Sequence, residues 1–395
     1  MNPNLNDYID HDALRREAFP IVASRTFLAH AGVTALPRVA TDALVDFGRH
    51  SQVDHQEAGD MMQRVDRVRG LCAKLIGAGD DEIALLGPTA LGLNMVADGI
   101  SWDSGDEVVF YADDYPANVY PWRKLVSRGV KPVAMEVQPQ GVITWPVVRE
   151  HLSARTRLVS LATANFLTGY RVDVDAIGFE LKKRGILFCV DGIQTLGAFP
   201  FSVEYVDFLS ADSHKWMLGP MGAGLVFIRK EHFNLCPPTL LGSWNVVSPH
   251  FIAQENIAFY EGGRRYEPGS LNLPGILSMG ASLELLLSLG VEAIAERIRH
   301  LRRCLIEGMR GAGWEYYFDG VEVEGEGSAS GLVTFCVPEG CYPGLMRGLE
   351  EEKIRVSVRH DRAGKVYLRA SPHFYNTEDE IDHLVCFCRC HAAKR

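Results

Sequence analysis

Residues 186–228 read ILFCVDGIQTLGAFPFSVEYVDFLSADSHKWMLGPMGAGLVFI and decide the fold of the chain. Apolar runs in this stretch, such as ILFCV and GLVFI, are continuous rather than alternating. Continuous runs are typical of strands that are buried on both faces, as in a parallel sheet covered by helices. Asp191 ends one predicted strand, and Lys215 follows the end of the next. Because parallel strands end at one edge of their sheet, we expect both side chains at that edge, where ligands of such folds bind.

The same alternation of strands and helices extends from about residue 60 to about residue 230. The predicted strands cover residues 83–86, 107–111, 130–137, 157–162, 186–191, 206–210 and 224–229. The predicted helices between them cover residues 62–76, 89–99, 119–127 and 174–183. This order predicts an α/β protein with a large, doubly wound, mostly parallel sheet of seven strands.

The remaining part of the chain has a different pattern. Residues 233–275 are rich in proline and glycine and predict a long loop, which in a compact protein is more often functional than filler. An α+β unit follows, with predicted helices at 276–289, 291–312 and 378–390 and predicted strands at 331–337, 354–358 and 366–370. We therefore expect an N-terminal segment (1–25) that packs with a small C-terminal domain (279–395), and a large domain over residues 26–278.

The composition excludes several classes of protein. Forty Lys and Arg residues against 50 Asp and Glu residues give a net charge of −10, and no basic run is present, so nucleic-acid binding is not expected. No apolar stretch approaches the roughly 18 residues of a membrane span, so we expect no membrane partner. The N-terminus lacks the pattern of a secretory signal, and nine cysteines lie mostly in apolar strands. These features predict a reduced, cytoplasmic enzyme.

Asp191 and Lys215 are the residue types that pyridoxal phosphate requires. Lys215 stands between a histidine and a tryptophan, where burial favours the neutral, nucleophilic amine. A lysine of this kind forms a Schiff base with the cofactor, and an acid keeps the pyridine nitrogen protonated. The residue types alone are equally compatible with a buried Asp–Lys ion pair.

Longer motifs distinguish between these alternatives. DGIQ at 191–194, followed by SHKWMLGPMGAG at 213–224, resembles the class V aminotransferase family of fold-type I pyridoxal phosphate enzymes. Within that family the chain looks most like the isopenicillin N epimerase-like and cysteine desulfurase-like branch. Other stretches that resemble the family follow its order: FLAHAGVTALP (27–37), GPTALGLN (87–94), YPANVYPW (115–122), TANFLTGYRVDV (163–174), RYEPGSLNLPG (265–275) and YLRASPHFYNTEDEID (367–382). Each stretch is weak alone, but their number and order are specific.

The resemblance implies pyridoxal 5′-phosphate as cofactor and gives roles to residues around its ring. Lys215 would hold the cofactor and then move the α-proton of the substrate, and Asp191 would stabilise the pyridinium. Gln194 and Asn165 would approach the ring hydroxyl oxygen. Without the resemblance, Gln194 reads as a polar residue that opens a helix and Asn165 as a turn residue.

The resemblance also implies residues for the cofactor phosphate. Thr89 and the amide of Ala90 stand at the start of a predicted helix, whose free N–H groups suit an anion, although Thr89 is also an ordinary helix cap. Ser213 and His214 would add side-chain donors. Ser270 corresponds to a family hydroxyl that reaches the phosphate of the partner subunit, which implies a homodimer.

At the substrate side, the resemblance implies that Arg369 binds the α-carboxylate through its fork of N–H donors. The alternative is an ordinary arginine on a strand edge. His30 and Tyr266 are candidates to line the substrate edge, although a lone histidine is more often structural.

The chain also departs from cysteine desulfurases, which carry a persulfide-forming cysteine shortly before this arginine. The corresponding stretch, 355–368, contains no cysteine, and the nearest ones upstream are Cys341 and Cys336. The stacking histidine of those enzymes is replaced, with Tyr115 or Pro116 at its place. Both differences argue against a persulfide route.

Two further motifs are discounted. GPMGAG at 219–224 precedes a strand, whereas the dinucleotide fingerprint follows one and opens a helix. The tail CFCRCH at 386–391 lacks a second pair of ligands at zinc spacing, so no metal is expected.

The sequence therefore predicts a homodimeric enzyme that acts on the α-carbon of a small amino acid, with transamination as the family default. A carbon–sulfur lyase without a persulfide cysteine and an amino-acid epimerase are the alternatives. A catalytically silent protein that binds pyridoxal phosphate on the same fold is a further one, which intact Asp191, Lys215 and Arg369 disfavour.

Overall fold

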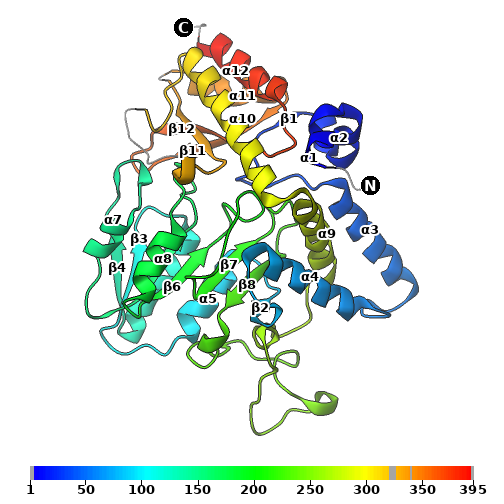
Figure 1. Cartoon of the computed structure of the whole chain (residues 1–395), viewed down its shortest axis with the longest axis vertical. Helices are drawn as coiled ribbons and strands as arrows, with labels where there is room; N and C mark the ends of the chain where they lie inside the picture. The colour runs from blue at the N-terminus through cyan, green and yellow to red at the C-terminus, as the bar shows by residue number, and fades with distance from the viewer. Residues whose placement is uncertain (1–3, 320–325, 339, 393–395) are drawn as a thin grey trace.

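The computed structural model describes residues 4–319, 326–338 and 340–392. A large helix-covered sheet lies beneath a smaller α+β unit in Figure 1. The large sheet has seven strands in the order β2-β8-β7-β6-β5-β3-β4, and only β8 runs antiparallel to its neighbours. The strands are β2 (Ile83–Ala84), β3 (Glu107–Tyr111), β4 (Lys131–Met135), β5 (Thr156–Ala162), β6 (Leu187–Asp191), β7 (Phe208–Asp212) and β8 (Gly224–Ile228). The predicted α/β fold with a mostly parallel sheet is confirmed.

Both faces of this sheet are buried, which is why its strands read as continuous apolar runs. On one face, Val109, Val159 and Val190 join a cluster with three helices. These helices are α4 (Met61–Ile76), α8 (Val174–Lys182) and α9 (Leu273–Leu289). On the other face, Val108 and Cys189 join a second cluster with α5 (Thr89–Gly99) and α6 (Tyr120–Arg123). Alternate side chains of one strand therefore enter two different cores.

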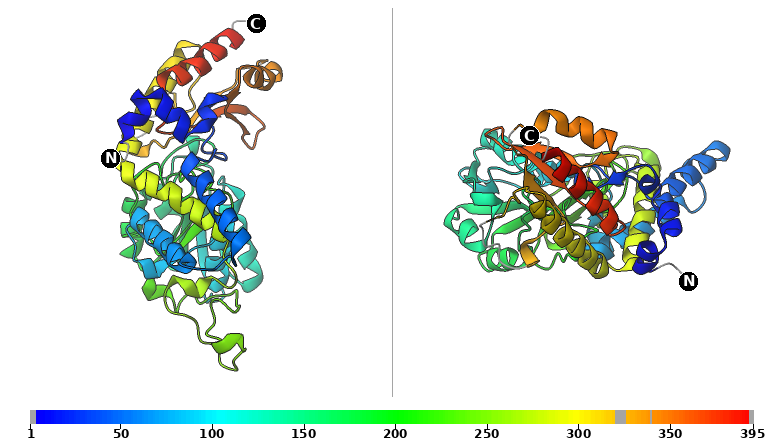
Figure 2. Two further views of the ribbon diagram at one scale, coloured as in Figure 1. Left: turned by 90° about the vertical axis from the view of Figure 1, so that its right-hand side faces the viewer. Right: turned by 90° about the horizontal axis from the view of Figure 1, so that it is seen from above.

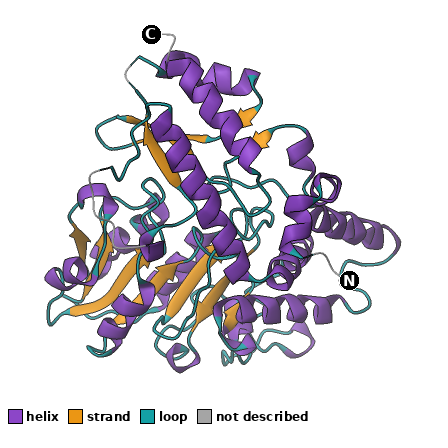
Figure 3. Ribbon diagram, turned by 45° about the horizontal axis from the view of Figure 1, so that its top comes forward, coloured by secondary structure: helices purple, strands orange, loops and turns teal. Residues whose placement is uncertain are grey.

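The smaller unit contains an antiparallel sheet of three strands in the order β11-β12-β9, which lies beside the C-terminal helices in Figures 2 and 3. Its strands are β9 (Val333–Cys336), β11 (Ser357–His360) and β12 (Val366–Ala370). Its helices are α10 (Val291–Gly311), α11 (Tyr342–Glu351) and α12 (Glu378–Ala392). This sheet brings β12 and β11 over the carboxyl edge of the large sheet.

The N-terminal residues contact the C-terminal part of the chain. Two short helices, α1 (Leu5–Asp10) and α2 (Asp12–Ala18), precede β1 (Thr26–Phe27), which pairs in parallel with β10 (Ile354–Arg355). Arg15 of α2 donates to the carbonyl of Tyr375 at 3.3 Å and pairs with Glu380 at 3.2 Å. The domain boundaries at residues 25 and 278 stay predictions.

The structure differs from the predicted elements at several places. The single strand expected at 354–358 is two strands, because β10 pairs with β1 whereas β11 pairs with β12. The helix expected at 119–127 is α6 followed by a 3₁₀ turn, Lys124–Arg128. Among the described residues, five α-helices were not predicted: α1, α2, α3 (Arg38–Val53), α7 (Trp145–Glu150) and α11. In α3 only Ala40 and Phe47 are buried, so its apolar periodicity is weak.

The proline- and glycine-rich stretch that follows β8 is a long connection, as expected. Part of it projects below the large sheet as an arm in Figure 1, and Phe251, Ile252 and Ile257 are exposed there. The connection ends at α9, which begins three residues before the predicted helix, with Asn272 accepting from the amide of Gly275.

Among the described residues, no single helix has the length and hydropathy of a membrane span, and α9 and α10 meet that test only together, as a pair bent by 83°.

Candidate active site

A cavity of about 900 Å³ lies where the two sheets meet. Its floor is formed by residues that follow the carboxyl ends of β3, β5, β6 and β7. Its other walls come from the segment after β1, from the start of α5 and from β10, β11 and β12. The cavity therefore occupies the edge at which doubly wound sheets bind their ligands.

Lys215 follows β7 and reaches into this cavity. Its side chain is buried, with 9% of the residue exposed, and its Nζ lies 5.7 Å from the centroid of the Tyr115 ring. Burial lowers the pKa of the Lys215 amine to about 8, although the charge of Asp191 opposes this effect. A substantial fraction of the amine is therefore neutral at a pH near 8, which a nucleophilic or proton-transferring lysine requires.

Asp191, the last residue of β6, is the buried acid of the cavity. Its Oδ1 accepts from the amide of Ile193 at 2.9 Å, and its Oδ2 accepts from Asn118 Nδ2 at 2.9 Å. Burial raises the pKa of the Asp191 carboxyl, whereas these two hydrogen bonds and the charge of Lys215 favour its ionised form. Asp191 is thus oriented by fixed donors and sits near a cation.

A second acid, Asp114, lies beside Asp191 in the lining of the cavity. It follows β3, and its Oδ1 accepts from the amide of Tyr115 at 2.6 Å. Burial and the charge of Asp191 raise the pKa of Asp114 to about 7, against its hydrogen bonds from Tyr115 and Asn118.

Thr89 and Ala90 open α5 and line the cavity. Thr89 Oγ1 accepts from the amide of Asp212 at 2.9 Å, and its carbonyl accepts from Ser210 Oγ at 3.0 Å. These bonds hold the start of α5 against the end of β7, so that the free amides of the first helical turn are near the cavity. Such amides bind anions.

Arg369 of β12 closes the cavity on the side of the smaller sheet. It is 1% exposed, and its Nη1 donates to the carbonyl of Phe166, while Nε and Nη2 have no hydrogen-bond partner. Burial and, to a smaller extent, the charge of Arg359 lower the pKa of the Arg369 guanidinium to about 9. A buried guanidinium with two unpartnered nitrogens is prepared to receive an anion.

The cavity brings together seven of the site residues predicted from the sequence: Thr89, Ala90, Asp191, Gln194, His214, Lys215 and Arg369. Gln194 is held by Trp216, whose Nε1 donates to Gln194 Oε1 at 3.3 Å. His214 Nδ1 lies 3.4 Å from Asp212 Oδ1.

Six predicted residues do not line this cavity: His30, Pro116, Asn165, Ser213, Tyr266 and Ser270. The ring of His30 is fully buried between the carbonyl of Ser371, at 2.8 Å, and the hydroxyl of Tyr375, at 2.6 Å. Tyr266 packs on Phe233 and donates to the carbonyl of Cys236 at 2.7 Å. His30 and Tyr266 are therefore core residues in this chain, and their expected place at the substrate edge is corrected.

Two of the others have structural hydrogen bonds of their own. Asn165 Oδ1 accepts from the amides of Leu167 and Thr168 at 2.9 and 3.0 Å, so its side chain closes a turn. Ser213 is fully buried and its hydroxyl donates to the carbonyl of Pro220 at 2.9 Å, so that it is not directed into the cavity.

Pro116 is replaced in the lining by its neighbour Tyr115, whose ring faces Lys215. Ser270 is exposed and lines a separate hollow of about 320 Å³ with Gly87 and Gly222. Within one chain it therefore lies outside the Lys215 cavity.

Sequence reasoning missed three residues of the site: Asn118, Asp114 and Arg359. Asn118 contacts Asp191 across 73 positions of the chain, and only the adjacency of strand ends reveals that contact. The motif YPANVYPW marked the segment of Asn118 but not this residue. The position of Arg359 in the cavity wall depends on the pairing of β11 with β12, which the sequence did not predict.

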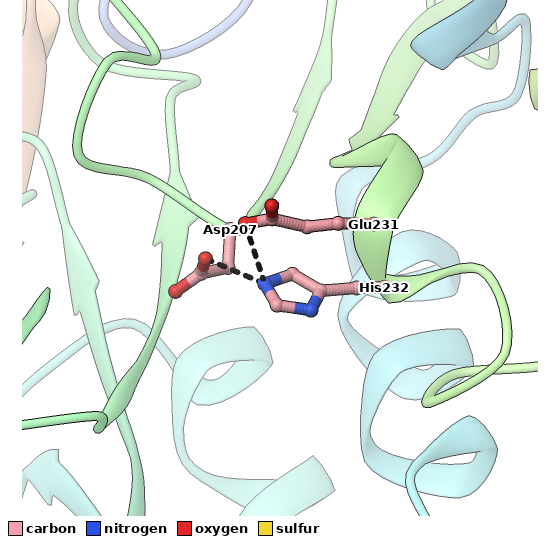
Figure 4. A group of neighbouring side chains, drawn as sticks. All are labelled: Asp207, Glu231 and His232. Carbon is pink, nitrogen blue, oxygen red and sulfur yellow. Dashed lines mark hydrogen bonds and ion pairs between the residues drawn. The ribbon is translucent and has the colours of Figure 1, made fainter.

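One group outside the cavity resembles a metal site. Asp207, Glu231 and His232 have ligand atoms within 4.8 Å of one another and are drawn in Figure 4. Asp207 Oδ1 already accepts from His232 Nε2 at 2.8 Å, and its Oδ2 accepts from the amide of Phe188 at 2.8 Å. Glu231 is exposed. These bonds explain the cluster as a structural tie between β7 and the turn after β8.

Comparison with known proteins identifies the family. The family profile of Aminotransferase class-V matches residues 26–384. The chain belongs to the aminotransferase class-V family. A probable cysteine desulfurase of Pyrococcus abyssi is 25% identical over 390 residues, which cover 93% of this chain and 94% of the relative. An uncharacterized aminotransferase, YcbU, of Bacillus subtilis is 25% identical over 379 residues, 94% of this chain and 95% of the relative.

Solved structures share the class-V fold. The apo structure of a cysteine desulfurase from Thermococcus onnurineus NA1 has a TM-score of 0.86 at 22% identity and covers 96% of each chain. The cystine C–S lyase C-DES, in complex with its reaction product cysteine persulfide, has a TM-score of 0.84 at 23% identity, covering 94% of this chain and 99% of its own.

Pyridoxal phosphate is the cofactor of this class-V enzyme, and the residues that line the cavity fit it. The cavity contains a lysine whose amine pKa is about 8, a buried carboxylate and the amino-terminal amides of α5. A pyridoxal phosphate site needs an amine to bond, an acid for its pyridine nitrogen and donors for its phosphate.

Proposed function

We propose that this pyridoxal phosphate enzyme transfers the amino group of a small α-amino acid, with Lys215 as the proton-moving residue and Arg369 as the residue that binds the α-carboxylate. The observation that carries the proposal is the arrangement of Lys215, Asp191 and Arg369 around one cavity, with Nε and Nη2 of Arg369 free to bind an anion. When bound, pyridoxal phosphate supplies an electron sink for the negative charge that develops on the α-carbon of the substrate.

The residues of this chain have separate tasks in the proposal. Lys215 would hold the cofactor in the resting enzyme. Its Nζ would then take the proton from the substrate α-carbon and deliver it to a carbon of the cofactor. Asp191, oriented by Asn118 and the amide of Ile193, keeps a proton on the pyridine nitrogen. Thr89, Ala90 and His214 bind the phosphate, and Gln194 approaches the ring hydroxyl oxygen. Arg369 fixes the α-carboxylate with its free Nε and Nη2.

A single-turnover experiment tests the reaction. The loaded enzyme is mixed with one amino acid at a time, without an acceptor, and the 2-oxo acid is measured. Transamination yields about one 2-oxo acid per subunit, with the carbon skeleton intact, because the cofactor retains the amino group until an acceptor removes it. At the same time, the fraction of cofactor that borohydride attaches to Lys215, measured by mass, declines. The Lys215→Ala variant should produce no 2-oxo acid, and borohydride should attach no cofactor to residue 215.

A carbon–sulfur lyase is the second candidate, and the names of the relatives favour it. It would release the substituent of the β-carbon and continue for many turnovers without an acceptor, which the same experiment detects as sulfide and pyruvate from cysteine. The absence of cysteine from the described lining of the cavity disfavours the persulfide route. Cys341 and Cys336, the nearest cysteines upstream of residues 355–368 in the sequence, do not line it. Repeated turnover of this kind would contradict transamination.

Two broader features belong to the proposal. We infer a homodimer, in which Ser270 of one subunit reaches the cofactor phosphate of the other. The exposed position of Ser270, outside its own cavity, supports this inference. We also infer a cytoplasmic location, which nine free cysteines support.

A further inference from the structure

The arginines on and beside the strands of the smaller unit differ in their partners. Arg355 of β10 pairs with Glu350 at 3.3 Å, and Arg362, just after β11, pairs with Asp113. Within the described parts of the chain, neither Arg359 nor Arg369 has an acidic partner. The two that lack partners are both in the wall of the Lys215 cavity.

The strand register places Arg359 and Arg369 on one face. Arg359 of β11 is opposite Tyr367, and Ser357 is opposite Arg369. Residues two apart on a strand share a face, so Arg359 and Arg369 are diagonal neighbours whose Cα atoms are about 7–8 Å apart. This arrangement presents two guanidinium groups side by side to one cavity.

The surroundings of Arg359 leave its guanidinium open to a ligand. It is half-buried, and its Nη1 donates only to the neighbouring carbonyl of Val358, at 3.0 Å. A Cβ atom at Gly32 would lie 3.8 Å from Arg359 Nη2 and 3.3 Å from Ser357 Oγ, so the glycine keeps this corner of the cavity clear. Burial lowers the pKa of Arg359, and the nearby Tyr115 hydroxyl opposes this effect.

The acidic and basic side chains of the cavity lie on different sides of it. The described acids of the lining are Asp114 and Asp191, which follow strands of the large sheet, and Asp191 is held by Asn118 and Ile193. The charges of Arg369 and Arg359 help to lower the pKa of Lys215, so both lie near its amine. The substrate side of the cavity therefore carries two cations with which no described carboxylate forms an ion pair.

We propose that Arg359 is a specificity residue that binds an anionic group on the substrate side chain, so that the preferred substrate is a dicarboxylic amino acid. One arginine receives the α-carboxylate and the other the side-chain carboxylate. An α-carboxylate alone satisfies one of the two guanidinium groups and leaves the other without a counterion, which is costly in a partly buried site. This inference rests on the proposed function for the reaction, but it concerns binding alone.

Equilibrium binding tests the inference without any turnover. The loaded enzyme is titrated by calorimetry with succinate and glutarate, and with butyrate, which has a single carboxylate. None of the three has an amino group. We expect the wild-type enzyme to bind a dicarboxylate about 10- to 100-fold more tightly than butyrate, because a hydrogen-bonded ion pair is gained. Arg359→Gln abolishes this preference, and Arg359→Lys retains part of it.

Arg355→Gln is the matched control, because Arg355 also borders the cavity but already has Glu350 as a partner. We expect it to retain the dicarboxylate preference. The inference is overturned if wild-type enzyme binds butyrate as tightly as succinate and glutarate, or if Arg359→Gln keeps the preference.

Turnover separates this inference from the proposed function. With aspartate and glutamate compared with asparagine and glutamine, Arg359→Gln should reduce the ratio of kcat/KM for acid over amide by about 10- to 100-fold, mainly through KM. An unchanged ratio overturns the inference while transamination stands. If no amino acid is transaminated but dicarboxylates still bind through Arg359, the proposed function fails and the inference stands.

Discussion

Lys215 carries a consequence for stability as well as for chemistry. Burial lowers the pKa of its amine from 10.5 to about 8, so between these values the unfolded chain binds more protons than the folded one. The destabilising effect of the buried ammonium is therefore fully present below pH 8, and it disappears as the pH rises from about 8 to 10.5. The folded state of the cofactor-free enzyme is therefore destabilised most at a pH below about 8, where Lys215 is charged.

We therefore expect cofactor-free Lys215→Met to have a higher free energy of unfolding than the cofactor-free wild type at pH 7. The net shift in the pKa of Lys215, which already includes the attraction to Asp191, corresponds to about 3 kcal/mol at most. Urea unfolding at pH 7 and pH 10 measures the difference, which should shrink at the higher pH. Lys74→Met, on the exposed side of α4, is the control. A difference that is the same at both pH values would contradict this account.

At the scale of residues, the sequence predicts the position of those site residues that lie next to a recognisable pattern in the chain. Asp191 directly follows a continuous apolar run and Lys215 follows the end of the next predicted strand, so their place at the sheet edge could be derived from sequence. Arg359 could not, because its place depends on a strand register that pairs β11 with β12. His30 and Tyr266 were misassigned, because a sequence shows a polar group but not the buried carbonyl or hydroxyl that satisfies it.

At the scale of elements, the turn after β6 positions the segment that carries Lys215. Gly197 in this turn has a φ of 91°, and a Cβ atom there would lie 2.6 Å from the carbonyl oxygen of Trp216 and 2.9 Å from the Cα of Met217. The turn and the Lys215 segment are therefore in direct backbone contact. Any side chain at this position must displace one of them.

We expect Gly197→Ala to destabilise the enzyme by about 2–4 kcal/mol, through the strained φ together with the steric clash. It should also weaken pyridoxal phosphate binding, because Lys215 moves with Trp216. Gly185→Ala is a matched control, since Gly185 has a φ of 66° but nothing within 4 Å of the added Cβ. Urea unfolding and cofactor titration measure both effects. Equal losses in the two variants would show that the backbone contact is unimportant.

The elements of the large sheet were predictable for a physical reason. Strands such as β3 and β6 bury both faces, so their central residues form continuous apolar runs, and β3 has its predicted bounds. The helix α3 was not predicted, because only two of its residues are buried against the rest of the protein and the others are exposed or half-buried. The division of β10 from β11 follows from a partner strand near the N-terminus, about 330 residues away, and no local pattern records such a partner.

At the scale of the whole molecule, the site joins both sheets. Lys215 and Asp191 come from the large sheet, Arg369 and Arg359 from the smaller one, and Arg369 bridges them by donating to the carbonyl of Phe166. Arg362 makes a second bridge, to Asp113 and the carbonyl of Ala112. Ser270 lies outside this region, in the hollow with Gly87 and Gly222, although Gly87 precedes the start of α5, which we propose binds the phosphate. A second copy of the chain would bring such a hydroxyl to the site from outside.

This arrangement predicts that two defective chains restore one site. Ser270→Asp repels the cofactor phosphate of a partner but keeps its own Lys215, whereas Lys215→Ala cannot bond the cofactor but keeps Ser270. When Ser270→Asp chains are refolded with about a tenfold excess of Lys215→Ala chains, most of them pair with an intact Ser270. At limiting pyridoxal phosphate, the cofactor that borohydride attaches to the Ser270→Asp chains, measured by mass, should then rise toward the wild-type level. If Ser270 acted within its own chain, or not at all, the excess of Lys215→Ala chains would change nothing, because each Ser270→Asp chain would keep the phosphate site it has alone.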